Sequence, residues 1–166
     1  MCARQLFLIR HAKSSWSDSS LRDIERPLNK RGNRDASFMA ELLKEKNIKP
    51  DLILSSSSVR TRSTAQYFVD QLMKAHQAFK IESRLYEASA STILNVINGT
   101  PVNVSVLMLF GHNPGLTSLH NFISAHYIDN IPTCGICCYS ISADWRQIKE
   151  KSCELEYFEY PKKYFE

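Results

Sequence analysis

Short apolar runs alternate with amphipathic segments along the 166-residue chain, and this alternation constrains the fold more than any other feature. The segments between the first four runs carry apolar residues at helical spacing; Ala36, Met39, Ala40 and Leu43 form one such stripe. Strand–helix alternation predicts an α/β fold, a three-layer α/β/α sandwich around a mostly parallel sheet of about six strands. The predicted strands are residues 5–9, 51–55, 79–83, 104–110, 135–141 and 153–160.

The predicted helices follow from the same pattern and from capping residues. We expect the first helix over residues 30–46 and the second around the apolar stripe of residues 65–73. Ser91 is predicted to cap a short helix over about residues 93–97, and Asn113 with Pro114 to begin another. Because no repeat, low-complexity tract or linker interrupts the pattern, residues 1–166 are predicted to form a single domain.

The charge and the N-terminal sequence limit the classes of partner. The chain carries a formal net charge of +4, and its basic residues are scattered rather than grouped. Such a distribution is compatible with an anionic substrate and disfavours a nucleic-acid partner. The apolar run at residues 6–9 is too short for a signal sequence or a membrane span. We therefore expect a cytoplasmic protein without a membrane partner.

The chain contains five cysteines, and an odd number without an export signal predicts reduced thiols. The segment "CGICC", residues 134–138, has a C-x-x-C spacing that metal and redox sites also use. No second Cys or His pair follows at a zinc-like spacing, and the segment lies in a predicted strand. Buried structural cysteines are therefore the favoured interpretation.

Reactive side chains follow each of the first four predicted strands. Arg10 and His11 end the first strand, Arg60 follows the second, Glu87 the third, and His112 with Asn113 the fourth. Ligands of open α/β sheets bind outside the carboxyl ends of the strands. The sequence therefore predicts that two histidines, two arginines and a glutamate converge at one edge of the sheet.

These residue types favour phosphoryl transfer. Arg10 and Arg60 can bind phosphate oxygens through their planar guanidinium groups, assisted by the helix N-terminus at Arg60. His11 can attack phosphorus as a neutral imidazole, and His112 can donate to the equatorial oxygens. Glu87 can protonate the leaving group and then activate water. No P-loop motif is present, and no metal or other cofactor is required if Arg and His supply the positive field.

Other polar residues near these motifs have structural interpretations. Ser55 to Ser58 are predicted to serve as turn and N-cap residues. The histidines outside the motifs lie in helical or post-helical contexts and are interpreted as surface or core-edge residues: His76, His120 and His126.

Five segments carry a resemblance to a known family: "LIRHAKSSW", "ERPLNKRG", "SSSSVRTRSTA", "LYEAS" and "GHNPGL". In order and spacing they resemble the histidine phosphatase superfamily, and within it the small SixA-type phosphohistidine phosphatases. The resemblance implies a phosphoglycerate mutase-like fold and a metal-independent phosphatase that forms a phosphohistidine intermediate on His11. It implies that Arg10, Arg60 and His112 hold the phosphoryl group and that Glu87 is the acid.

The chain also departs from the family pattern. Ala12 stands in place of the usual Gly of an Arg-His-Gly motif, and Ser57 in place of a frequent Pro. Ser17 stands where mutase-like members often have an Asn near the phosphate, and Ser17 and Asn113 complete the predicted substrate-binding set. The long insertions that cover the site in mutases are absent, which favours a shallow site and a protein carrying phosphohistidine as the substrate.

Two alternatives to this function remain open from the sequence. One keeps the catalytic site but takes a small phosphomonoester as its substrate. The other is a phosphate-binding adaptor domain without catalysis.

Overall fold

The computed structural model describes residues 3–74 and 78–165, and within them the strands form one six-stranded sheet. The strands are β1 (Arg4–Arg10), β2 (Leu52–Ser55), β3 (Ala78–Ile81), β4 (Val106–Gly111), β5 (Ile136–Ile141) and β6 (Glu154–Glu159). Their order across the sheet is β3-β2-β4-β1-β5-β6. Strands β3, β2, β4 and β1 run parallel, and β5 runs antiparallel to both of its neighbours, β1 and β6. The mostly parallel sheet predicted from the sequence is confirmed.

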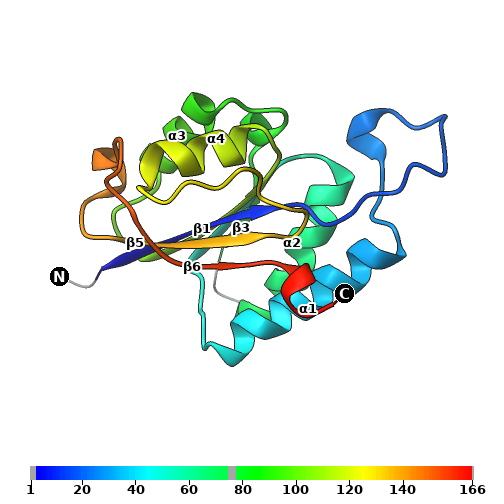
Figure 1. Cartoon of the computed structure of the whole chain (residues 1–166), viewed down its shortest axis with the longest axis horizontal. Helices are drawn as coiled ribbons and strands as arrows, with labels where there is room; N and C mark the ends of the chain where they lie inside the picture. Colours follow the sequence, from blue (N-terminus) through cyan, green and yellow to red (C-terminus); the bar gives the residue numbers. More distant parts are fainter. Residues whose placement is uncertain (1–2, 75–77, 166) are drawn as a thin grey trace.

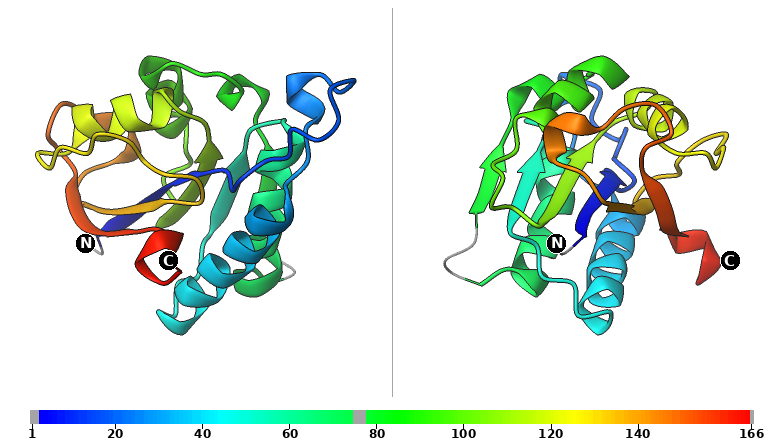
Figure 2. Two further views of the ribbon diagram at one scale, coloured as in Figure 1. Left: turned by 45° about the vertical axis from the view of Figure 1, so that its right-hand side comes forward. Right: turned by 90° about the vertical axis from the view of Figure 1, so that its left-hand side faces the viewer.

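Two pairs of helices cover the two faces of the sheet (Figures 1 and 2). The helices are α1 (Lys30–Glu45), α2 (Val59–Leu72), α3 (Ala90–Asn98) and α4 (Gly115–Ile123). Successive strand side chains point to opposite faces. In β1, Leu6 and Leu8 therefore pack with α3 and α4, whereas Phe7 and Ile9 pack with α1 and α2. The result is the predicted three-layer sandwich with one apolar core on each side of the sheet.

The central strands are buried on both faces, as the uninterrupted apolar run of β4 predicts. Its residues 107 to 110 are fully buried, and β4 lies between β1 and β2. The alternating last strand, β6, lies at an edge of the sheet, also as predicted. Because β1, β2 and β4 are adjacent and parallel, their carboxyl ends meet at one edge.

Two helix starts differ from the prediction. The Ser89 side chain, and not Ser91, caps α3 by accepting a hydrogen bond from the Thr92 backbone, so the helix begins earlier than expected. Helix α4 begins at Gly115, and Asn113 is not its N-cap. The Asn113 amide oxygen accepts instead from the Thr117 backbone and hydroxyl, because contacts to a distant loop hold this side chain.

Gly32 allows α1 to approach the chain that follows His11. A Cβ atom at this position would lie 2.1 Å from the Lys13 carbonyl oxygen, which no side chain tolerates. The glycine of "ERPLNKRG" therefore serves a close backbone approach directly beside the site.

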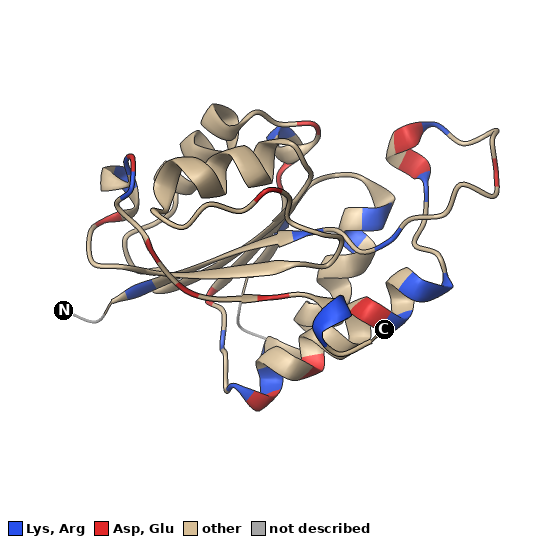
Figure 3. Ribbon diagram, viewed as in Figure 1, with Lys and Arg blue, Asp and Glu red and all other residues tan. Residues whose placement is uncertain are grey.

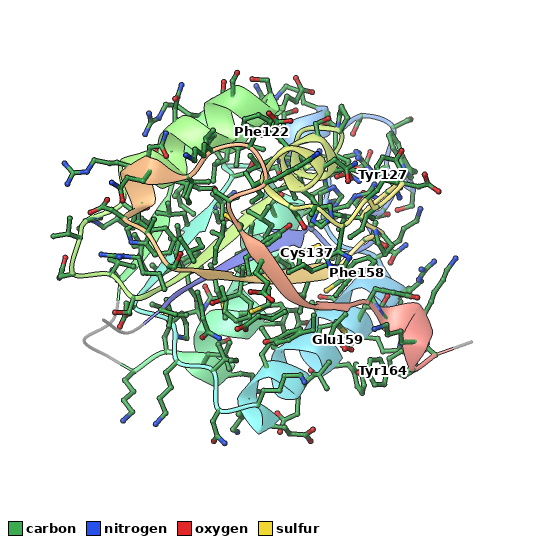
Figure 4. All side chains as sticks on the ribbon, turned by 60° about the vertical axis from the view of Figure 1, so that its left-hand side comes forward. Phe122, Tyr127, Cys137, Phe158, Glu159 and Tyr164 are labelled. Carbon is green, nitrogen blue, oxygen red and sulfur yellow. The ribbon has the colours of Figure 1, made fainter. Side chains whose placement is uncertain are left out.

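The four cysteines in the described residues form no disulfide and are buried, as expected for structural cysteines; they are Cys134, Cys137, Cys138 and Cys153. Cys137 and Cys138 point into the two opposite cores, and Figure 4 shows Cys137 within the sheet. Cys2 lies outside the described residues. Burial raises the pKa of the Cys137 thiol to about 12, so this thiol stays protonated near neutral pH.

The described part of the chain contains no helix with the length and apolar character needed to cross a membrane. Figure 3 shows Lys and Arg interspersed with Asp and Glu along the chain rather than collected in one segment.

Candidate active site

The ends of β1 and β4 and the start of α2 bring four of the predicted residues together. Arg10 is the last residue of β1 and pairs in register with Gly111 of β4, so His11 and His112 follow neighbouring strands at the same level. Their rings lie 5.2 Å apart between centroids. Arg60, the second residue of α2, contacts both rings. These four residues therefore lie together, as their positions after neighbouring strands predict.

Hydrogen bonding fixes the tautomer of His11. Its Nδ1 lies 2.8 Å from the carbonyl oxygen of Ala12, and because a carbonyl only accepts, Nδ1 carries the proton. Nε2 is then left with a free lone pair. The side chain of Thr64 accepts from the Ala12 backbone N–H and donates to the Arg60 carbonyl, which ties this segment to α2. The imidazole is held in the form that a nucleophile requires.

Arg60 connects the two histidines to a carboxylate. Its Nε lies 3.4 Å from His11 Nε2, and its Nη2 lies 3.5 Å from His112 Nδ1. Both distances lie at the limit of the normal hydrogen-bond range, and because Arg60 only donates, the contact to His112 is a hydrogen bond only when Nδ1 carries no proton. The same guanidinium donates shorter bonds to Asp23, 2.7 Å to its carbonyl and 3.0 Å to its carboxylate. Arg60 is thus fixed by Asp23 while its other edge faces the imidazole nitrogens.

The second histidine is supported by hydroxyl groups at the end of β2 and the start of α2. His112 Nε2 lies 2.7 Å from Ser56 Oγ and 3.4 Å from Thr61 Oγ1. A hydroxyl can donate or accept, so Ser56 can hold His112 in either tautomer. With Ser56 donating to Nε2, the His112 Nδ1 proton is free to face a ligand beside Arg60.

Burial keeps both imidazoles neutral. Desolvation, followed by the cationic and imidazole neighbours, lowers the pKa of His11 to about 3. Burial and the Arg60 charge lower the pKa of His112 to about 4. The cluster therefore carries the two guanidinium charges and two neutral rings near pH 7, a combination suited to a bound anion.

Arg10 presents donors that the protein does not use. Its Nη1 donates to the Ile131 carbonyl at 2.9 Å, and its buried Nε has no hydrogen-bond partner among the described residues. A buried donor without a partner is costly, and a ligand oxygen would satisfy it. Burial also lowers the pKa of Arg10.

Glu87 lies on the loop between β3 and α3, at the same edge but exposed to solvent. It has a positive φ of 52°, a backbone conformation that non-glycine residues rarely adopt. The loop is packed against the start of α4, where a Cβ on Gly115 would lie 2.0 Å from the Ala88 carbonyl oxygen. Glu87 makes no hydrogen bond to the four clustered residues in the described structure.

The two other predicted substrate contacts lie away from the cluster. Ser17 is exposed and hydrogen-bonds to Ser15. The Asn113 amide donates to Asn130 and to the Ile131 carbonyl, so it holds a loop instead of facing the histidines. Because Arg10 donates to the same Ile131 carbonyl, Asn113 supports Arg10 indirectly.

Asp23 is a site residue that the sequence reasoning did not identify. It lies on the loop of residues 14–28, which we call the rim loop, and accepts hydrogen bonds from Arg60, Tyr86 and Arg26. The Tyr86 hydrogen bond, with further help from Arg60, lowers the pKa of Asp23 to about 2. Desolvation and Asp23 raise the pKa of Tyr86 to about 12.

The sequence offered little signal for these supporting residues. Asp23 is 37 positions from Arg60, in a loop without periodicity. The sequence predicts Ser56 only as a turn or N-cap residue, whereas its hydroxyl contacts His112. The N-cap role of the serine segment holds, since Ser58 accepts from the Thr61 backbone.

The remaining histidines differ in their surroundings. His126 is exposed, as interpreted. For His120 the interpretation is wrong: it is fully buried between the Tyr139 hydroxyl and the His126 carbonyl, each at 2.6 Å. Two hydrogen bonds satisfy both ring nitrogens and allow the burial. His76 lies outside the described residues. No group of three or more potential metal ligands is found in residues 3–74 and 78–165.

Comparison with known proteins supports the assignment to a family. An uncharacterized chloroplastic protein of Arabidopsis thaliana is 38% identical over 141 residues, which cover 80% of this chain and 64% of the plant protein. A crystal structure from Agrobacterium tumefaciens, described as a candidate phosphohistidine phosphatase SixA, is 29% identical with a TM-score of 0.79, covering 95% of this chain and 98% of that one.

A structure of the protein histidine phosphatase SixA complexed with tungstate has a TM-score of 0.80 at 18% identity, covering 96% of this chain and 98% of that one. This likeness shows a shared fold. The model of the histidine phosphatase superfamily (branch 1) matches residues 6–94, more than half of the chain. The matched region contains Arg10, His11, Arg60 and Glu87. The chain therefore belongs to the histidine phosphatase superfamily.

Proposed function

We propose that this protein is a metal-independent phosphatase that works through a phosphohistidine intermediate on His11 and removes phosphate from phosphohistidine on a protein. The observation that carries the proposal is the state of His11. Its Nδ1 donates to a backbone carbonyl, and its unprotonated Nε2 faces the Arg60 guanidinium at 3.4 Å. A neutral imidazole nitrogen beside a fixed cation is suited to attack an anionic phosphoryl group.

The first step transfers the phosphoryl group to the protein. The His11 Nε2 lone pair forms a bond to phosphorus as the bond from phosphorus to the leaving nitrogen or oxygen breaks. Arg10 and Arg60 bind the phosphoryl oxygens, and His112 Nδ1 donates to a third oxygen while Ser56 donates to Nε2. The Glu87 carboxyl group gives its proton to the leaving group.

The second step returns His11 to its starting state. Water attacks phosphorus, the Nε2–phosphorus bond breaks, and the Glu87 carboxylate takes the proton from the water. The Nδ1 hydrogen bond to Ala12 persists through both steps and stabilises the phosphorylated imidazole in one orientation. The products are inorganic phosphate and the restored enzyme.

Two observations support a protein substrate; a cytoplasmic location is also part of the proposal. The chain is 29% identical to the SixA-type protein from Agrobacterium tumefaciens. In addition, strands β1 to β6 form a single sheet, and the described residues form no additional subdomain over the carboxyl ends of these strands (Figure 2). A site without a covering subdomain is suited to a side chain that projects from a protein.

A second candidate function is the hydrolysis of small phosphomonoesters. The position of Glu87 at the site edge favours it, because alkoxide leaving groups need protonation more than imidazole does. A phosphate-binding adaptor would not need His11 to be held with a free Nε2, so the geometry favours catalysis.

Substrate comparison tests the proposed function. We expect kcat/KM for a phosphohistidine protein to exceed that for sugar phosphates by at least about tenfold. Glu87→Gln should lower turnover of alkyl phosphates more than turnover of phosphohistidine, because an alkoxide leaving group needs protonation more than imidazole does. Higher kcat/KM for a sugar phosphate would instead support the second candidate, and binding of phosphate without hydrolysis of any substrate would support an adaptor.

A further inference from the structure

Trp16 presents a large aromatic surface to solvent at the edge of the site. Its side chain is 72% exposed, although a tryptophan is usually buried over most of its area. It lies on the rim loop, which projects beyond the end of the sheet (Figures 1 and 2). A bridge between Ser14 and Leu28 and a hydrogen bond from Ser15 to Pro27 close the base of this loop.

The indole is held in place by a buried arginine. The Arg26 guanidinium carbon lies 3.5 Å from the centroid of the Trp16 ring, a close cation–π contact. Arg26 is itself only 7% exposed, and it donates to Ser14 Oγ at 2.7 Å and to the Ser15 carbonyl at 3.2 Å. One face of the indole therefore rests on a fixed cation, and the other faces solvent.

The same arginine links the indole to the nucleophile. Arg26 Nε donates to one carboxylate oxygen of Asp23 at 3.2 Å, and Arg60 donates to the other at 3.0 Å. Arg60 in turn lies 3.4 Å from His11 Nε2. Trp16 is thus placed relative to His11 by a continuous series of contacts.

The position of Trp16 at the rim of the site determines which part of a substrate can contact the indole ring. A histidine side chain is short, so a phosphohistidine that reaches His11 brings its polypeptide against the rim of the site. A free amino acid or a sugar phosphate has no such polypeptide. Rigid aromatic side chains lose little conformational entropy on binding and are frequent among the strongest contacts of protein interfaces.

We propose that Trp16 is a specificity-determining residue for protein substrates, and that its solvent-facing indole surface packs on the polypeptide that carries the phosphohistidine. This inference rests on the proposed phosphohistidine phosphatase function. It assigns to Trp16 recognition of the substrate body and no part in the transfer of the phosphoryl group.

Two substrates with the same leaving group separate recognition from chemistry: a protein phosphorylated on a surface histidine, and free phosphohistidine. Trp16→Ala should lower kcat/KM for the protein about tenfold, mainly through KM, and change kcat/KM for the free amino acid less than about twofold. Trp16→Phe should retain most of the activity toward the protein, because an aromatic face remains.

Tyr127→Ala is the matched control. Tyr127 is 75% exposed, on the loop that follows α4 (Figure 4), and in the described structure it makes no hydrogen bond or ring contact with Arg26, Asp23 or Arg60. The Tyr127→Ala substitution should not change kcat/KM for either substrate. Equal losses on both substrates in Trp16→Ala, or no loss on the protein, would overturn the inference.

Fluorescence gives a second measurement that does not depend on turnover. The chain has two tryptophans, and the other, Trp145, is fully buried. When a tryptophan-free phosphohistidine protein is added to the His11→Ala variant, Trp16 emission should shift to shorter wavelength, and the Trp16→Phe double variant should not respond. Saturable binding without that shift would contradict the inference. If the wild-type enzyme hydrolyses neither phosphohistidine substrate, the proposed function itself fails.

Discussion

At the scale of single residues, the chemistry depends on which nitrogen of His11 carries a proton. The Ala12 carbonyl selects Nδ1, and burial holds the pKa of His11 at about 3. The neutral Nδ1–H form should therefore persist well below the usual imidazole pKa.

Nitrogen NMR of the imidazole rings tests this state directly. At about pH 5.5 the His11 resonances should show one protonated nitrogen, Nδ1, and an unprotonated Nε2. A doubly protonated His11 at that pH would contradict the mechanism, since the attacking lone pair would be absent.

Asp23→Asn tests the carboxylate that fixes Arg60. The pKa of Asp23 is lowered from 3.8 to about 2, so its ionised form is favoured in the folded protein. The resulting stability is present above about pH 3.8 and is lost as the pH falls through about 2. Wild type should be more stable than Asp23→Asn near neutral pH, and the difference should shrink between about pH 4 and pH 2 in urea unfolding. A difference independent of pH would show that the ion pair contributes no stability.

Site residues that follow strands could be predicted from the sequence, whereas site residues that lie on loops could not. Arg10 and His112 follow apolar runs whose direction and pairing determine where they lie. Asp23 and Tyr86 reach the site from irregular segments, and no periodicity marks their positions. The predicted role of Ser17 rests on the family resemblance and that of Asn113 on its place beside His112 after a strand, whereas their hydrogen bonds direct them to other partners.

At the scale of elements, the sequence pattern located the α-helices and strands of the described residues but not the short 3-10 helices, because burial on two faces of one sheet determines only the longer elements. The ends of α3 and α4 were less predictable. A cap depends on which of several nearby polar groups reaches the first free N–H, and Ser89 competes there with Ser91 and Thr92.

Gly115→Ala tests how α4 positions the Glu87 loop. A Cβ at Gly115 would lie 2.0 Å from the Ala88 carbonyl oxygen, so the loop or the helix must move. We expect a loss of about 2 kcal/mol in the free energy of unfolding and a lower kcat for alkyl phosphates. Gly99→Ala is the control: its nearest contact is 3.5 Å away, and the change should stay within about 0.5 kcal/mol. Equal effects of the two substitutions would show that the close approach is not required.

At the scale of the whole molecule, two apolar cores clamp the central strands and make the ends of β1 and β4 a rigid base for the site. Rigid strands hold the two histidines at a fixed separation, and the rim loop adds Asp23 and Trp16 from one side. In this arrangement the nucleophile, His11, follows a rigid strand, whereas the residue proposed to recognise the substrate, Trp16, lies on a projecting loop.

The most direct test of the central claim is to trap the enzyme during turnover with ³²P-labelled phosphohistidine protein and locate the label. We expect phosphate on His11, stable to base and labile to acid, and no label or turnover in His11→Ala. Turnover that persists in His11→Ala, or label on another residue, would contradict it.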